Sequence, residues 1–218
     1  MEDLTRGAKN ILATYYQATA DEVVHGREWY ELAREVAIEL AKPHEGLSFY
    51  ATAGVLSALS PSVEWGVNVR AAETMVEAYM DGAESPPIVA GYTQNREKAW
   101  RILQDRPTSL SEAATYFDPD TAPKTRAFVV SIVTGGMSTA VCVDRHAVAV
   151  REGRRLTAEE GQLWPAKYRR VANDYRAAAR HVGVEVGKLQ AIVWVTWRRI
   201  HEVNDTHQNG DEVDPWDE

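Results

Sequence analysis

The stretch KTRAFVVSIVTGGMSTAVCVDRHAVAV, residues 124–150, decides how this chain folds. Its first part belongs to a helical pattern over 123–134, and Gly135 and Gly136 are typical of a helix end because glycine adopts left-handed backbone angles at little cost. After a short link, Asp144 can begin a second helix, since an aspartate there accepts a backbone N–H. The stretch therefore predicts two helices joined by a short connection.

The rest of the chain has the same helical character. Apolar residues recur three and four positions apart, as on one face of a helix, and proline or glycine follows many of these segments. Strands compete only at 128–133 and 139–143, which are both short. The sequence therefore predicts an all-α fold. The expected helices cover 3–19, 21–42, 47–59, 63–80, 93–105, 109–117, 123–134, a segment that begins after Asp144, 165–182 and 185–201.

Composition excludes several kinds of site. The 218 residues include one cysteine, Cys142, so a disulfide framework, a four-cysteine zinc site and an iron–sulfur cluster are excluded. The six histidines show no metal-ligand spacing, and no phosphate-binding loop, HExxH helix or dinucleotide motif is present. We therefore expect no metal and no cofactor. No run is long enough to span a membrane, and the N-terminal MEDLTRGAKN lacks signal-peptide character, so we expect a cytoplasmic protein without a membrane partner.

Charge is unevenly distributed along the chain. The formal net charge is -8, but residues 202–218 hold seven acidic residues and no Lys or Arg. Residues 144–181, in contrast, carry nine basic against five acidic residues. A basic surface, as nucleic-acid binding requires, can therefore coexist with an acidic tail. We expect the tail to be solvated and disordered, and it could also contact a protein partner.

Residues 124–150 resemble the helix-hairpin-helix DNA glycosylases of the endonuclease III and archaeal 8-oxoguanine glycosylase type. In that family a hairpin precedes a lysine at a helix start, and a hydrophobic helix and a short link lead to V/I-D-x-H and a further helix. Lys124 matches the lysine, and Val143-Asp144-Arg145-His146 matches the second motif. Lys124 and Asp144 are 20 positions apart, a spacing similar to the family's.

Two further blocks support this resemblance. Residues 55–71, VLSALSPSVEWGVNVRA, are similar to the family's L-L-S-x-Q-[TA]-x-D-x-x-V-N-x-A block. Residues 91–99, GYTQNREKA, resemble a glycine followed by a Lys-Ala pair that opens a helix. The three blocks occur in family order over about 46–150, roughly half of the chain. The chain also resembles phage-encoded members of this group, including amino-acid:DNA transferases that hypermodify thymine.

The resemblance implies a fold and a function. The fold would consist of two helical lobes: a central domain at 46–140, and a second lobe built from 1–45 and 141–201, because the family builds that lobe from both chain ends. The function would be action on a base flipped out of DNA, with cleavage of the N-glycosidic bond and a possible lyase step. The partner implied is DNA.

The resemblance also assigns catalytic candidates. Cleavage of the N-glycosidic bond develops positive charge on the sugar, and Asp144 would stabilise that charge or activate the attacking group. Lys124, in its neutral form, would attack the sugar carbon and form a Schiff base. From the residues alone, a helix N-cap is the better explanation of Asp144, and the resemblance makes a catalytic role an equal alternative. A lysine at a helix start is unfavourable beside the positive end of the helix dipole, so helix electrostatics do not explain Lys124 and a functional role is an alternative explanation.

Other residues are candidates for contacts with DNA or with the flipped base. Leu59 stands where the family has a glutamine wedge that fills the gap left by that base. From the residues alone, Asn68 is better explained as a helix-surface amide, His146 as a local hydrogen-bonding or packing residue, and the arginines of 165–182 as a solvated face. The candidates are Leu59, Asn68, Tyr92, Arg145, His146, Arg169 and Arg176.

The chain departs from the family at the hairpin. The family has L-P-G-V-G-x-K there, whereas residues 116–124 are YFDPDTAPK, so both glycines are missing. Those glycines let backbone N–H groups approach a phosphate, which Asp118 and Asp120 would instead repel. Three functions therefore stay open: a glycosylase or glycosylase/lyase, a phage-type enzyme that modifies a flipped base, and a non-catalytic descendant that binds DNA or protein.

Overall fold

The computed structural model describes residues 4–201, and every regular element in that part of the chain is a helix. The helices are α1 (Arg6–Tyr15), α2 (Ala20–Ala41), α3 (Phe49–Leu59), α4 (Trp65–Met80), α5 (Thr93–Asp105), α6 (Leu110–Ala114), α7 (Pro123–Thr134), α8 (Arg145–Glu152), α9 (Pro165–Val182) and α10 (Val186–Ile200). The all-α class expected from the sequence is confirmed. Residues 128–133 lie inside α7 and 139–143 form a link without regular structure. The expected disordered tail, 202–218, lies outside the described residues.

The described chain divides into two compact units. Unit 1 consists of 4–33 and 119–201, and unit 2 consists of 34–118. The helix α2 contributes its first part to unit 1 and its last turns to unit 2. The sequence-based division placed α7 in a central domain at 46–140, whereas the structure places it in unit 1. The physical reason is packing, because Phe128 of α7 lies against two aromatic rings of α2.

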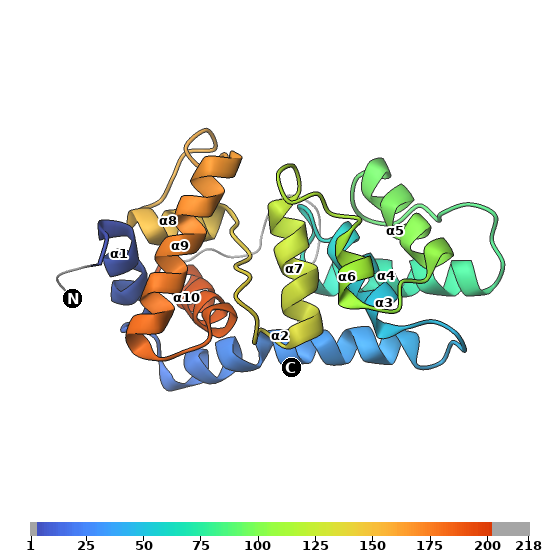
Figure 1. The fold of residues 1–218 in the computed structure, drawn as a ribbon, viewed down its shortest axis with the longest axis horizontal. Coiled ribbons are helices and arrows are strands. Elements are labelled where there is room, and N and C mark those ends of the chain that lie inside the picture. The colour runs from blue at the N-terminus through green and yellow to red at the C-terminus, as the bar shows by residue number, and fades with distance from the viewer. Residues whose placement is uncertain (1–3, 202–218) are drawn as a thin grey trace. The chain divides into compact units, whose positions relative to one another are not determined.

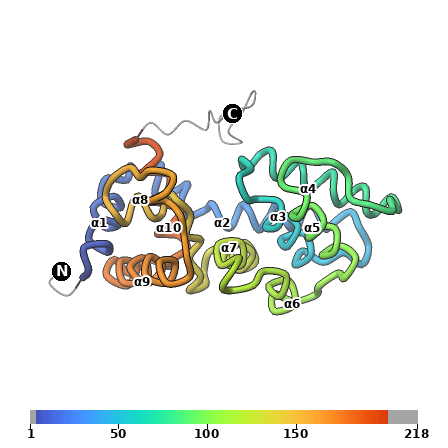
Figure 2. Tube along the Cα trace, turned by 90° about the horizontal axis from the view of Figure 1, so that it is seen from above, coloured from blue at the N-terminus to red at the C-terminus, as the bar shows by residue number. Residues whose placement is uncertain are grey.

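Unit 1 has one continuous apolar core. The helices α1, α8, α9 and α10 contact one another and contribute most of its side chains, and Figures 1 and 2 show them grouped together. Ile11, Tyr175 and Leu189 are fully buried in it. Each comes from a different helix and from a stripe of apolar residues with helical spacing. The core thus fixes the helices from which the candidate residues of this unit project.

Glycines allow two close approaches in unit 1. A Cβ atom added to Gly26 of α2 would lie 2.5 Å from the backbone nitrogen of Ile192 in α10. A Cβ added to Gly187 of α10 would lie 2.6 Å from the carbonyl oxygen of Gly136. Such distances are shorter than any van der Waals contact, so only glycine lets these backbones pack so closely. These contacts hold α10 against α2 and against the end of α7.

Unit 2 is organised around α3. Its residues 51–59 are all buried, and the helix packs against α4, α5 and α6. Leu56 and Leu59 meet a core that includes Met75, Ile102 and other fully buried side chains of these helices. Because α3 is apolar on all sides, it requires neighbours all round. The helix expected from the sequence over 47–59 is present, and it begins at Phe49.

Candidate functional site

Lys124 and Asp144 stand at the first turns of two helices of unit 1. Lys124 follows Pro123, which begins α7 and suits the first helical position because proline has no N–H to leave unpaired. Asp144 is the N-cap of α8, and its Oδ1 accepts a hydrogen bond from the backbone N–H of Ala147 at 2.7 Å. Both side chains are half-buried. The two catalytic candidates therefore lie at two helix starts within one unit.

Tyr168 of α9 connects these two helix starts. Its hydroxyl donates to the carbonyl oxygen of Val141 at 2.6 Å and lies 3.1 Å from the carbonyl oxygen of Pro123. The same hydroxyl accepts from the backbone N–H of Val143 at 3.4 Å. Pro123 precedes Lys124, and Val143 precedes Asp144. One buried hydroxyl thus joins the residue before each candidate.

Cys142 makes a second connection. Its Sγ lies 3.8 Å from the carbonyl oxygen of Lys124, within reach of a weak S–H hydrogen bond. Burial raises the pKa of the thiol to about 12; the charge of Asp144 adds to the rise and that of Lys124 opposes it. Because both charges act on one buried atom, Lys124 and Asp144 lie within electrostatic reach of the same point in unit 1. The thiol itself is protonated at neutral pH and is not a nucleophile.

His146, in the first turn of α8, lies among several charges. Burial lowers its pKa, Asp144 opposes that change, and Arg145, Arg198 and Lys124 lower the pKa further. The imidazole is therefore neutral at pH 7 and can donate or accept a proton through its ring nitrogens. This arrangement brings four of the sequence-predicted residues together: Lys124, Asp144, Arg145 and His146.

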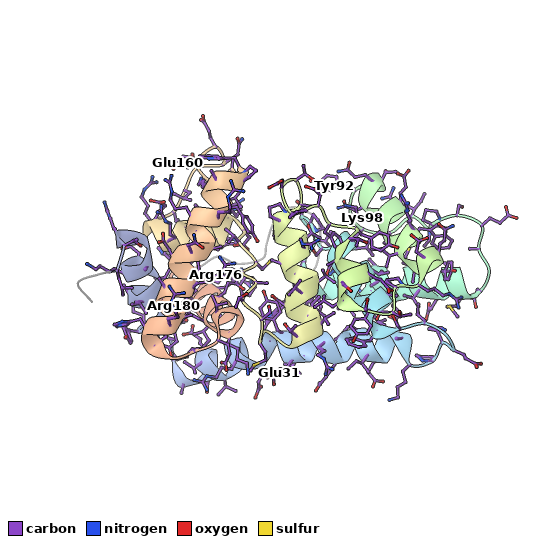
Figure 3. All side chains as sticks on the ribbon, viewed as in Figure 1. Glu31, Tyr92, Lys98, Glu160, Arg176 and Arg180 are labelled. Atoms are coloured by element: carbon purple, nitrogen blue, oxygen red, sulfur yellow. The ribbon has the colours of Figure 1, made fainter. Side chains whose placement is uncertain are left out.

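An arginine stripe runs along the outer face of α9. We define it as Arg169, Arg176 and Arg180, and Figure 3 shows the last two projecting from the helix. Arg176 donates from Nε to the carbonyl oxygen of Thr139 at 2.9 Å, so this side chain lies over the link that leads to Asp144. Arg169 lies 3.7 Å from Asp120, an exposed ion pair just before α7. The predicted contacts Arg169 and Arg176 thus border the link and the start of α7.

The two units differ in net charge. Residues 4–33 and 119–201 of unit 1 hold 17 Lys and Arg against 11 Asp and Glu, an excess of six positive charges. Residues 34–118 of unit 2 hold 7 against 12, an excess of five negative charges. The overall acidity therefore hides a basic unit. That unit contains both catalytic candidates and the arginine stripe.

Comparison with known proteins assigns the chain to a family. The model of DUF7178, a family of unknown function, matches residues 2–201. The chain belongs to this family. No curated protein and no solved structure matches it. The matched range includes every helix that the structure describes in this DUF7178 member, and it therefore covers both units.

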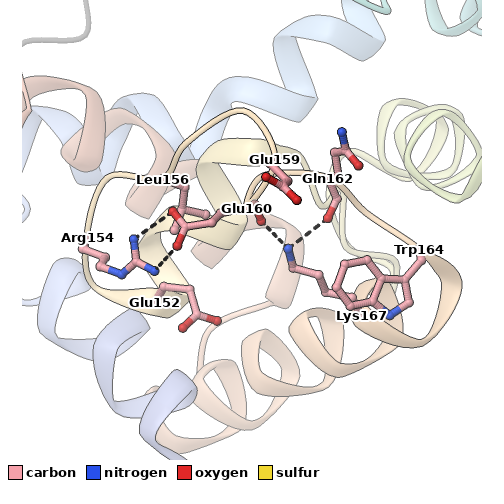
Figure 4. Close-up of a pocket in the computed structure, with 8 residues that line it drawn as sticks. All are labelled: Glu152, Arg154, Leu156, Glu159, Glu160, Gln162, Trp164 and Lys167. Atoms are coloured by element: carbon pink, nitrogen blue, oxygen red, sulfur yellow. Dashed lines mark hydrogen bonds and ion pairs between the residues drawn. The ribbon is translucent and has the colours of Figure 1, made fainter.

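A shallow hollow lies near the candidate site of this DUF7178 chain. It has a volume of about 470 Å³ and is bordered by the end of α8, the loop 153–164 and the start of α9 (Figure 4). The residues that line it form an ion pair with one another, since both terminal guanidinium nitrogens of Arg154 donate to the Glu160 carboxylate. Lys167 lies over the Trp164 ring at 4.9 Å. These lining side chains bind one another, and their interactions stabilise the loop 153–164.

The remaining predicted contacts lie in unit 2. Leu59 is fully buried in the core, so it would have to leave that core to fill a gap in DNA. Asn68 is 1% exposed, and its Nδ2 donates to the carbonyl oxygen of Leu56 at 3.0 Å, a bond that joins α4 to α3. These placements favour structural roles for both residues. Tyr92 is 56% exposed at the start of α5, with its hydroxyl 3.5 Å from the Ser62 hydroxyl.

Sequence reasoning missed Tyr168 and Cys142 as parts of the site. The helical pattern of 165–182 places Tyr168 on the inner face, but it does not reveal which backbone groups its hydroxyl meets.

Within residues 4–201, no group of three or more His, Cys, Asp and Glu side chains is placed to hold a metal ion. In the same range, no helix combines the length and the apolar character needed to cross a membrane.

Proposed function

We propose that this protein acts on a base flipped out of DNA and cleaves its N-glycosidic bond, with Lys124 and Asp144 as the catalytic residues. The observation that carries the proposal is the connection between the two helix starts. Tyr168 and Cys142 hold the backbone next to Lys124 and next to Asp144. A lysine and a carboxylate in the same region of one unit are the groups that this chemistry uses.

The reaction can be written for these residues. The neutral amine of Lys124 attacks the C1′ carbon of the sugar, the bond from C1′ to the base nitrogen breaks, and the base leaves with the electron pair and takes up a proton that the attacking amine loses. Asp144 stabilises the positive charge that develops on the sugar. The bond from C1′ to the ring oxygen then breaks, the ring oxygen takes the electron pair and the second amine proton, and an imine forms between C1′ and Lys124. In a variant of this scheme, Asp144 activates a water molecule instead and no imine forms.

The charge of unit 1 supports DNA as the substrate. Phosphates are neutralised by Lys and Arg, and unit 1, which contains the candidate site, carries six excess positive charges. Asp120 was expected to repel a phosphate, but Arg169 lies 3.7 Å from it and offsets its charge. The guanidinium groups of the arginine stripe would contact the phosphate backbone of the DNA, and such contacts do not depend on the base sequence.

A second candidate function is DNA or protein binding without catalysis. The observation that favours it is the hydrogen bond from Ala147 to Asp144, because this bond alone explains an aspartate at the start of α8. A third outcome, in which a flipped base is modified and stays attached, uses the same two residues without base release. Base release by variants of Asp144 separates the glycosylase function from the other two functions, in which the base stays attached.

The test compares Asp144→Asn with Asp144→Ala on a panel of duplexes that contain uracil, oxidised, alkylated or hydroxymethylated bases. Asparagine caps a helix as well as aspartate does, so Asp144→Asn should keep the stability and the DNA affinity of the protein. It should slow base release by about 100-fold or more, because the stabilising charge is lost. Base release by Asp144→Asn at the wild-type rate, or no release from any duplex by the wild type, would refute the glycosylase proposal.

A further inference from the structure

The hollow at the end of α8 has the size of a small-ligand site. Its volume of about 470 Å³ falls within the roughly 300–1,000 Å³ of pockets that hold small organic molecules. Most of the residues that line it belong to the loop 153–164. A Cβ added to Gly161 in this loop would lie 3.5 Å from the Cβ of Arg145, the residue that follows Asp144. The loop that forms the hollow therefore also reaches the start of α8.

Trp164 offers a flat aromatic surface in this hollow. Lys167 lies over its ring at 4.9 Å. The Lys167 ammonium also donates to the carbonyl oxygens of Glu160 and Gln162, the second at 2.9 Å, so the lysine is held in place. Trp164 is nevertheless 57% exposed, and part of its indole ring stays open to solvent. An open aromatic ring of this kind is a surface on which a nucleic-acid base can stack.

The side of the hollow opposite Trp164 is fixed by an ion pair. Arg154 donates to the Glu160 carboxylate at 2.6 and 3.0 Å, and this interaction lowers the pKa of Glu160 to about 2. The same carboxylate accepts from the backbone N–H of Thr157 at 3.0 Å. Figure 4 shows Arg154 and Trp164 on opposite sides of the hollow. Of the described residues that line it, both cations, Arg154 and Lys167, therefore bind groups of the protein, which leaves neither of them to bind a phosphate.

Glu159 and Gln162 supply polar groups that the fold does not use. Both line the hollow and are exposed, and within residues 4–201 neither side chain makes a hydrogen bond or an ion pair. A carboxylate only accepts hydrogen bonds, whereas an amide both donates and accepts. Adenine, cytosine and guanine carry amino groups that can donate to a carboxylate, and glutamine forms paired hydrogen bonds with adenine. Thymine presents a carbonyl oxygen instead, which a carboxylate repels.

We propose that this hollow binds an unstacked nucleic-acid base that carries an amino group. The base stacks on Trp164, its amino group donates to the carboxylate of Glu159, and the amide of Gln162 bonds to a neighbouring position of the base. The six excess positive charges of unit 1 favour a nucleic acid as the source of such a base. The proposal does not rest on cleavage of a glycosidic bond, so it goes beyond the proposed function.

Binding is measured on the full chain by NMR titration with single deoxynucleosides. The signals to follow are the backbone amides of the loop 153–164 and the indole N–H of Trp164, which is identified by its loss in Trp164→Phe. Because the hollow is open, deoxyadenosine, deoxyguanosine and deoxycytidine should shift these signals with a Kd on the order of 1 mM. Thymidine should bind at least about fivefold more weakly. No shift with any nucleoside, or an equal affinity for thymidine, would overturn the proposal.

Variants of Trp164 test the stacking contact through the same loop amides. Trp164→Leu removes the ring and should weaken binding about 10-fold or more, whereas Trp164→Phe keeps an aromatic face and should retain most of the affinity. Tyr16→Leu removes another exposed ring of unit 1, directly after α1, and should bind as the wild type does. Wild-type affinity in Trp164→Leu would show that no base stacks on this ring.

Glu159→Gln tests the choice of base. An amide can donate to the carbonyl oxygen of thymine, so this variant should bind thymidine and the amino-bearing nucleosides with nearly equal affinity. Glu28→Gln changes an exposed carboxylate on α2 of the same unit and should keep the wild-type preference. An unchanged preference in Glu159→Gln would overturn the role of its carboxylate. Nucleoside binding without base release from any duplex would support this site while the proposed function failed, and base release without nucleoside binding would do the reverse.

Discussion

The hydroxyl of Tyr168 lies 3.1 Å from the carbonyl oxygen of Pro123, the residue that directly precedes Lys124. The hydroxyl oxygen of Tyr168 also accepts a hydrogen bond from the backbone N–H of Val143, the residue that directly precedes Asp144. A tyrosine buried in α9 therefore fixes the separation of two helix starts that are far apart in sequence. Positioning of this kind is what a two-residue catalytic site needs, because small displacements of reacting groups reduce rates strongly.

Tyr168→Phe should remove these hydrogen bonds and leave the aromatic ring in place. The carbonyl of Val141 and the N–H of Val143 would lose their partner in a buried site, so the free energy of unfolding should fall by about 1–3 kcal/mol. Chemical denaturation measures this change, and hydrogen exchange should show opening at 141–143. Tyr175→Phe is the control, since the Tyr175 hydroxyl makes only a 3.4 Å contact with the Ala147 carbonyl oxygen. Equal losses for the two variants would contradict a special role for Tyr168.

Gly26→Ala should destabilise unit 1. The added Cβ would lie 2.5 Å from the backbone of Ile192, so α2 and α10 would have to move apart. Overpacking of this kind costs roughly 1–3 kcal/mol or more. Thermal unfolding measures the effect. Gly161→Ala is a matched control, because its Cβ would meet Arg145 at an ordinary 3.5 Å, and its stability should stay near that of the wild type.

Cys142 should react slowly with thiol reagents. Burial raises the pKa of its thiol to about 12, so the reactive thiolate is scarce at pH 8. A colorimetric disulfide reagent should therefore label the native protein far more slowly than the unfolded protein, which should give one thiol per chain. Rapid labelling of the native protein at pH 8 would show that the core around Cys142 is open.

Glu22 should make the stability of unit 1 depend on pH. Burial raises the pKa of this carboxyl, but the bonds from Arg199 and from the Thr19 N–H outweigh burial and the net shift is downward from 4.5. Its contribution to stability is therefore complete above about pH 4.5 and is lost as the pH falls through the lowered value. Glu22→Gln should destabilise the protein by about 1–3 kcal/mol at pH 7. The difference from the wild type should shrink at pH 3, and an equal difference at both pH values would contradict this account.

The helices could largely be predicted from the sequence, because their causes are local. Proline at the first position of α7 and α9, glycine after α7, and Asp144 before α8 are start and stop signals that act over one turn. These elements needed no knowledge of distant contacts.

The boundaries of the units and much of the site could not be predicted in the same way. The helix α7 joins unit 1 because Phe128 meets rings of α2, a contact between residues about a hundred positions apart. Leu59 and Asn68 lie in a block that resembles the family's, but the resemblance cannot reveal that Leu59 is buried in the core and that Asn68 bonds to α3. The role of Tyr168 depends on three backbone groups from two other segments, which periodicity alone cannot identify.

The most direct test of the central claim is borohydride trapping of the protein on DNA that contains a damaged or modified base. If Lys124 forms an imine with the sugar, reduction should link the wild type and Lys9→Ala covalently to the DNA, and Lys124→Ala should give no linked product. Lys9 is exposed on α1 of the same unit, so its removal controls for the loss of one positive charge. Trapping of Lys124→Ala at the wild-type level, or no trapping of the wild type on any substrate of the panel, would contradict a catalytic role for Lys124 as the nucleophile.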